Sequence, residues 1–172
     1  TRQQYENMAL LDFFEPEARV ELLDGVIVDM SPQRSFDATT VCLVEEVLRS
    51  VFKAGHTVRN QMPLALDENS EPEPDVAVVP GKVRDYTQAH PTTAVLIVEV
   101  ADVTLRLDRK TKRAVYARNG IAEYWIVNLK DNNLEVYRDP QGDQYRLQMT
   151  LQPEETVAPL AQPDQMIAVA DL

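Results

Sequence analysis

Residues 94–100 read AVLIVEV, an apolar run that is interrupted only by Glu99. A run of this kind is typical of a strand in the middle of a sheet, where both faces are buried. A carboxylate at such a position costs several kcal/mol unless it is paired or binds a cation. This one stretch therefore predicts both a central strand and a buried acid that needs a partner.

The elements on either side of this strand predict a mixed α/β fold. Strand-like runs at 57–66 and 75–79 precede it, and another at 123–128 follows it. Apolar residues three and four apart predict a helix over 37–54, and a second helix over 108–118 ends at Asn119-Gly120. The predicted order is helix, three strands, helix, strand, around one mixed α+β sheet.

Hairpins flank this predicted core. The stretch Arg19–Met30 indicates an N-terminal hairpin around Asp24-Gly25, a pair that favours a two-residue turn. Residues 134–138 and 144–151 predict a C-terminal hairpin, and residues 5–14 a short helix. The tail beyond Pro153 is weakly ordered by pattern. Because no linker interrupts the 172 residues, we expect a single domain over 1–172.

Composition limits the class of protein. Hydrophobic residues make up 44% and charged residues 26%, which excludes wholesale disorder. No apolar run approaches the ~20 residues of a membrane-spanning helix, and residues 1–8 lack a signal-peptide pattern. We therefore expect a cytoplasmic protein with no membrane partner. One cysteine and two histidines exclude an internal disulfide and a Cys-rich or His-rich metal site.

Charge is unevenly spread along the chain. Seventeen basic against 28 acidic residues give a net charge of -11, which argues against coating nucleic acid by bulk attraction. Residues 67–75 hold five acids and no base, whereas residues 105–118 hold six bases and one acid. These runs are either ordinary solvated faces or an acidic metal site beside a basic patch that contacts phosphate.

Three residues suggest chemistry. Asp75 opens one predicted strand, Glu99 lies near the end of the next, and Lys112 lies on the following helix. Two carboxylates on neighbouring strands repel each other, and hard oxygen ligands select Mg²⁺ or Mn²⁺. A lysine facing them would orient water or stabilise charge during phosphodiester hydrolysis. The alternative from spacing alone is a structural ion-pair network.

Several motifs in order make the family recognisable. They are VELLDGVIVDMSP at 20–32, Gln61, EPEPDV at 71–76, VEVAD at 98–102, Asp108-Arg109 with Lys112, YARNGI at 116–121 and EYWIV at 123–127. With these motifs the chain, over roughly residues 5–145, resembles the Uma-two family of predicted endonucleases. That family is a branch of the PD-(D/E)xK, restriction-endonuclease-like superfamily. Its core order agrees with the order predicted above.

This resemblance implies an Mg²⁺-dependent (or Mn²⁺-dependent) endonuclease that hydrolyses DNA, with a homodimer expected by analogy. It implies Asp75 and Glu99 as metal ligands and Lys112 as the catalytic lysine. Glu21 and Gln61 match recurring family positions and are candidates for the outer edge of the site.

Two departures from the family pattern accompany these assignments. The superfamily usually places its lysine two residues after the glutamate, where this chain has Ala101. A frequent family histidine aligns with Asp37, which is otherwise interpreted as a helix cap. Two alternatives are therefore kept. One is an inactive nuclease-fold module with an interaction or regulatory role, and the other is a hydrolase of another phosphate ester.

Overall fold

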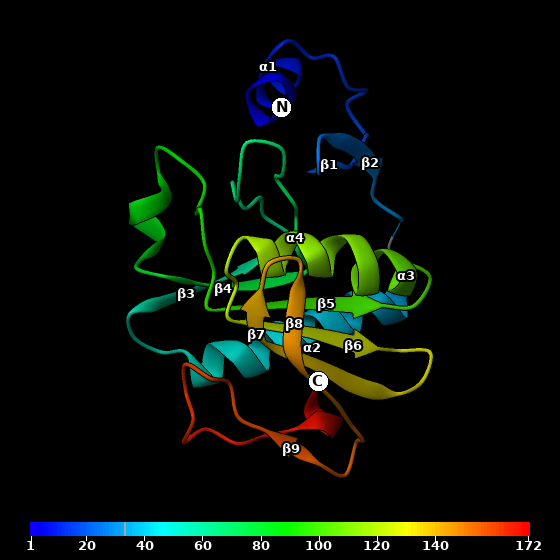
Figure 1. The fold of residues 1–172 in the computed structure, drawn as a ribbon, viewed down its shortest axis with the longest axis vertical. Coiled ribbons are helices and arrows are strands. Elements are labelled where there is room, and N and C mark those ends of the chain that lie inside the picture. The colour runs from blue at the N-terminus through cyan, green and yellow to red at the C-terminus, as the bar shows by residue number, and fades with distance from the viewer. Residues whose placement is uncertain (33) are drawn as a thin grey trace.

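The computed structural model describes residues 1–32 and 34–172, and a six-stranded sheet forms its centre (Figure 1). In pairing order the strands are β3 (His56–Asn60), β4 (Val76–Pro80), β5 (Leu96–Ala101), β6 (Glu123–Asn128), β7 (Asn133–Gln141) and β8 (Gln144–Leu151). All neighbours are antiparallel except β5 and β6, which are parallel. A parallel pair needs a crossover, and here a helix supplies it.

Helices cover both faces of the sheet (Figure 1). On one face lies α2 (Ser35–Val51), whose Leu48 packs in a cluster with Val98 of β5. On the other lies the crossover, made of α3 (Leu105–Leu107), a π-helical turn η2 (Asp108–Lys112) and α4 (Arg113–Arg118). There Val115 packs in a second cluster with Ile97. Because side chains alternate along a strand, Glu99 shares the crossover face with Ile97.

The remaining elements lie around this core. They are α1 (Arg2–Leu10), the antiparallel hairpin of β1 (Val20–Leu23) and β2 (Val26–Asp29), a 3₁₀ turn η1 (Val83–Tyr86), the pair β9 (Thr156–Val157) and β10 (Ile167–Ala168), and a 3₁₀ turn η3 (Val169–Asp171). Asp24 and Gly25 both have positive φ, as a tight hairpin turn requires. Within the described ranges, no helix is long and apolar enough to cross a membrane.

The predicted core order is confirmed, and the strand at 123–128 has the predicted bounds. The predicted N-terminal hairpin is confirmed, and the predicted C-terminal hairpin forms as β7 and β8 within the main sheet. The helix predicted at 5–14 lies earlier, because Thr1 caps its start by accepting from the Gln4 amide. The strand predicted at 57–66 ends at Asn60, because Gln61 turns the chain with a φ of 47°.

The weak order expected beyond Pro153 is wrong. Val157 and Ile167 pair in β9 and β10, and both side chains are buried in the α2-side cluster. Val169 and the terminal Leu172 belong to the same cluster. Other apolar residues of this segment, such as Leu160 and Met166, are exposed, so the sequence does not show which of them cover the sheet core.

Candidate active site

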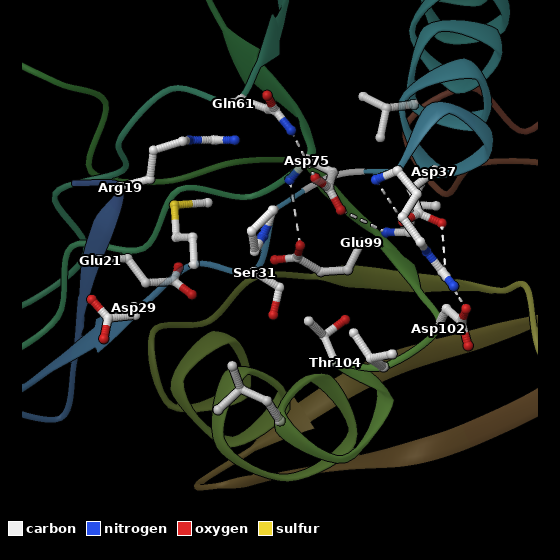
Figure 2. Close-up of a pocket in the computed structure, with 17 residues that line it drawn as sticks. Arg19, Glu21, Asp29, Ser31, Asp37, Gln61, Asp75, Glu99, Asp102 and Thr104 are labelled. Atoms are coloured by element: carbon white, nitrogen blue, oxygen red, sulfur yellow. Dashed lines mark hydrogen bonds and ion pairs between the residues drawn. The ribbon is translucent and has the colours of Figure 1, made fainter. Parts of the chain in front are cut away.

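A pocket of about 320 Å³ lies where β4, β5 and the N-terminal hairpin meet (Figure 2). Asp75, Glu99, Glu21 and Gln61 all line it. Asp75 comes directly before β4, and the register that sets Val76 opposite Val98 brings it beside Glu99 of β5. Two predicted metal ligands, 24 positions apart in sequence, therefore share one pocket.

Asp75 is held by neighbouring amides. The backbone N–H of Val100 donates to Asp75 Oδ2 at 2.8 Å, and the side-chain amide of Gln61 donates to Oδ1 at 3.1 Å. The Asp75 backbone N–H lies 3.4 Å from Oε2 of Glu99. Gln61 therefore orients Asp75, and its unusual backbone angle lets its own N–H donate to the Asp75 carbonyl at 3.1 Å.

Lys112 joins two of the acids. Its Nζ lies 3.0 Å from Glu99 Oε1 and 3.2 Å from Glu21 Oε1. The exposed fractions are only 5% for Lys112, 3% for Glu99 and 2% for Glu21. Tyr116, four residues after Lys112 on the same helical face, donates its hydroxyl to Glu99 Oε1 at 2.7 Å. The crossover helix thus supplies two donors to one carboxylate oxygen.

The π-helical turn lies at this contact. Such turns are rare and often occur at functional positions, because they shift the helix face that follows. Both residues at its ends, Asp108 and Lys112, are buried. Oδ2 of Asp108 has no hydrogen-bond partner among the described atoms, and burial raises the pKa of this carboxyl to about 6.

The buried acids outnumber the lysine. Burial raises the pKa of Glu99 well above its usual value, and the nearby Lys112 ammonium offsets only part of that rise. Burial alone would lower the pKa of Lys112, but Glu99, Glu21 and two further acids raise it well above its usual value. The neighbouring acids therefore favour the protonated form of Lys112, which lies close to more than one carboxyl group.

Comparisons with known proteins identify the family and the fold. Residues 2–170 match the model of the Uma2 family, which is described as "Putative restriction endonuclease". This chain belongs to the Uma2 family. A crystal structure of "a putative nuclease belonging to DUF820" from Anabaena variabilis matches with a TM-score of 0.74 and 14% sequence identity. The match covers 94% of the Uma2 chain and 93% of the other, and it establishes a common fold. No curated protein matches the sequence.

The acidic pocket of this Uma2 chain fits a divalent cation of the magnesium type. Its two adjacent carboxylates are hard oxygen donors, and Mg²⁺ is commonly bound through one or two carboxylates with water filling other positions. Among residues 1–32 and 34–172, no group of three or more His, Cys, Asp or Glu side chains is placed so that it could hold a metal ion. A cation in this pocket would therefore have Asp75 and Glu99 as its carboxylate ligands, and water or backbone carbonyls would have to complete its coordination.

The predicted site residues occupy two layers in the Uma2 structure. Asp75, Glu99, Glu21 and Gln61 line the pocket, whereas Lys112 lies behind the two glutamates and is not among the lining residues. Glu21 was expected at the outer edge, but its carboxylate is buried against the lysine. The predicted cap role of Asp37 is confirmed, since its carboxylate accepts from the Arg34 backbone N–H at 3.2 Å.

Sequence reasoning missed two arginines on the pocket wall. Arg34 pairs with both Asp37 and Asp102, and Arg19 reaches into the pocket from just before β1 (Figure 2). Neither arginine belongs to a motif with recognisable spacing: Arg19 directly precedes β1, and Arg34 is the N-cap residue of α2. Tyr116 was not among the predicted site residues, although its spacing of one helical turn from Lys112 places it on the same face.

Proposed function

We propose that this Uma2 protein is a metal-dependent endonuclease that hydrolyses phosphodiester bonds in DNA, with Mg²⁺ or Mn²⁺ as its cofactor. The observation that carries the proposal is the convergence of Asp75 and Glu99 in one pocket, with Lys112 bonded to Glu99. The description of the family as a restriction endonuclease supports DNA as the substrate. A homodimer stays a prediction from the resemblance.

Asp75 and Glu99 would hold the ion, with the carbonyl of Val100 as a further candidate ligand. A bound divalent cation would supply Lewis-acid polarisation of a phosphate oxygen and a bound water whose pKa is lower than that of bulk water. Hydrogen bonds within the protein hold both ligand side chains in place. Gln61 and the Val100 amide orient Asp75, while Tyr116 and Lys112 hold the far oxygen of Glu99.

Lys112 contributes charge and does not act as a base. Its raised pKa keeps the amine protonated at neutral pH, so it has no lone pair with which to accept a proton. Two of its three N–H donors face Glu99 and Glu21. We assign it the task of orienting Glu99 and balancing negative charge beside the bound phosphate.

Cleavage of supercoiled plasmid tests the proposal. We expect nicking or linearisation with Mg²⁺ or Mn²⁺ that EDTA abolishes, and a loss of about 10²-fold or more in Asp75→Asn and Glu99→Gln. The control is Glu46→Gln, an exposed acid on α2 outside the pocket, which should cleave like the wild type. Cleavage that survives in both site variants would show that the activity belongs to another site or to a contaminant.

A second candidate function is an inactive nuclease-fold module that serves as an interaction or regulatory partner. The observation that favours it is Lys112, which is bound between two glutamates and is absent from the pocket wall. This module would fold and melt cooperatively, yet it would neither cleave DNA with any divalent metal nor bind Mn²⁺. If the folded wild type neither cleaves DNA nor binds Mn²⁺, this second function would replace the endonuclease proposal.

A further inference from the structure

The six bases between Leu105 and Arg118 fall into two groups. Four have partners: Arg109 with Glu135, Lys112 with Glu99, Arg118 with Asp143, and Arg113 over the ring of Tyr137. For Arg106 and Lys110, no ion pair is present within residues 1–32 and 34–172. Four of the six bases therefore already have a partner within the protein, whereas Arg106 and Lys110 can pair with an external partner.

Arg106 and Lys110 lie on one side of the crossover helix. They are four residues apart, so their Cβ atoms are about 5–6 Å from each other on the same helical face. Both are exposed, and both line a second hollow together with Ser31, Val103, Thr104, Leu107 and Thr111. The two bases thus form a short cationic ridge, which we call the 106/110 ridge.

This second hollow is continuous with the acidic pocket. Ser31, Val103, Thr104 and Leu107 line both of them. Thr104 is the residue at the junction that Figure 2 labels, and it lies beside the helix and below Glu99 in that view. A strand bound at Asp75 and Glu99 would therefore pass over Thr104 directly onto the 106/110 ridge.

We propose that the 106/110 ridge contacts the phosphates that neighbour the phosphate in the acidic pocket, on the same DNA strand. These contacts would set the direction in which the strand leaves the site. The inference rests on the proposed function and identifies its substrate contacts. No acid is among the described residues that line the second hollow, whereas six acids line the first. A chain of net charge -11 needs such a local cationic contact to hold a polyanion beside an acidic pocket.

The occupant that this ridge favours is nucleic acid. A phosphate backbone offers evenly spaced charges to two cations one helical turn apart, and long Arg and Lys side chains reach separate phosphates. Arg34, at the start of α2, is already paired with Asp37 and Asp102, so it offers less charge to a ligand. An acidic peptide is the competing occupant, and the experiment includes it.

The experiment measures DNA affinity against salt. Full-length protein is titrated into a short fluorescein-labelled duplex in EDTA at several NaCl concentrations, and anisotropy gives the binding constant. In Arg106→Ala/Lys110→Ala we expect the salt slope to shrink by about 1.8, because each phosphate that is no longer neutralised lowers it by about 0.9. The control removes two other exposed cations, in Lys53→Ala/Arg84→Ala, and its slope should equal that of the wild type. The charge-conserving variant Arg106→Lys/Lys110→Arg should have the same salt slope as the wild type.

Each failure has its own signature. If the ridge variant and the control keep the wild-type slope while plasmid cleavage still depends on Asp75, the ridge proposal is wrong and the endonuclease proposal stands. If the wild type neither binds duplex nor cleaves plasmid, both proposals are wrong. An equal decrease of the salt slope in the ridge variant and the control would indicate that DNA binding depends only on the overall charge of the protein. It would overturn the ridge proposal. A polyglutamate peptide that competes as well as unlabelled duplex would overturn the assignment to DNA.

Discussion

The ammonium of Lys112 lies 3.0 Å from Oε1 of Glu99, and the two residues are 13 positions apart on a helix and a strand. The contact is buried, and Glu21 of the N-terminal hairpin completes it from a third element at 3.2 Å. Three segments that are distant in sequence, namely β1, β5 and the crossover helix, therefore meet through one cation. Their meeting fixes the inner wall of the acidic pocket and suggests the predictions that follow.

Removing the Lys112 cation should destabilise the protein strongly. In Lys112→Met the length of the side chain is kept, but Glu99 and Glu21 lose their counterion in a buried place. We expect the free energy of unfolding to fall by about 3–5 kcal/mol. Urea denaturation measures it. Lys110→Met, on the exposed side of the same helix, is the matched control and should cost well under 1 kcal/mol. Equal effects would mean that the buried ion pairs contribute no special stability.

The Tyr116 hydroxyl should position Glu99 as well as stabilise the fold. Tyr116→Phe removes the 2.7 Å bond to Glu99 and should cost about 1–3 kcal/mol. Tyr145→Phe is the matched control, since its hydroxyl donates to the Ile121 carbonyl at 2.8 Å, away from the site. Both variants should lose stability, but only Tyr116→Phe should bind Mn²⁺ more weakly. Unchanged Mn²⁺ affinity in Tyr116→Phe would assign this hydroxyl to packing alone.

Glu71 should make stability depend on pH. Burial and the neighbouring Glu6 carboxyl raise the pKa of Glu71 from its ordinary 4.5 to about 7. Between these values the folded chain holds more protons than the unfolded chain, so this group lowers stability as pH rises from 4.5 to about 7. Thermal melts of wild type and Glu71→Gln across this interval measure it.

The stability of Glu71→Gln relative to the wild type should increase as pH rises, because a glutamine cannot ionise. Glu68→Gln is the control, since Glu68 is an exposed acid in the same loop. A constant difference between wild type and Glu71→Gln over the whole interval would show that Glu71 does not titrate there.

The C-terminal segment should contribute to core stability. Ile167 is 4% exposed in the α2-side cluster, whereas its neighbour Met166 is 62% exposed. Ile167→Ala should lower the free energy of unfolding by about 2–5 kcal/mol, and Met166→Ala should change it little. Urea denaturation measures both. Similar small costs in the two variants would mean that the segment does not pack as described.

The central sheet could be predicted because its strands carry their own signal. The run at 94–100 is apolar except for Glu99, the strand at 123–128 has the apolar centre YWIV, and α2 shows one apolar stripe, so local pattern and final burial agree. Sequence patterns gave the wrong prediction where tertiary contacts determine the structure. The crossover helix begins at Leu105 and not at 108, and residues 153–172 gain order only by covering the sheet.

The candidate site was partly predictable for a similar reason. Asp75 and Glu99 stand out because each puts a charge beside a buried strand, and Lys112 follows from the family pattern. The layer that Lys112 occupies depends on a π-helical turn, which sequence patterns of ordinary helices do not reveal. The place of Arg34 depends on where α2 begins and on its pairing with Asp102, 68 positions away, which no periodic pattern indicates.

Direct titration with Mn²⁺ tests the central claim most directly, because it needs neither substrate nor turnover. Free Mn²⁺ is followed by its electron paramagnetic resonance signal in wild type, Asp75→Asn, Glu99→Gln and the exposed control Glu46→Gln. We predict a site in the wild type and the control, with affinity lowered about tenfold or more in both pocket variants. Equally tight Mn²⁺ binding in all four proteins, or no binding in the wild type, would contradict the assignment of Asp75 and Glu99 as metal ligands.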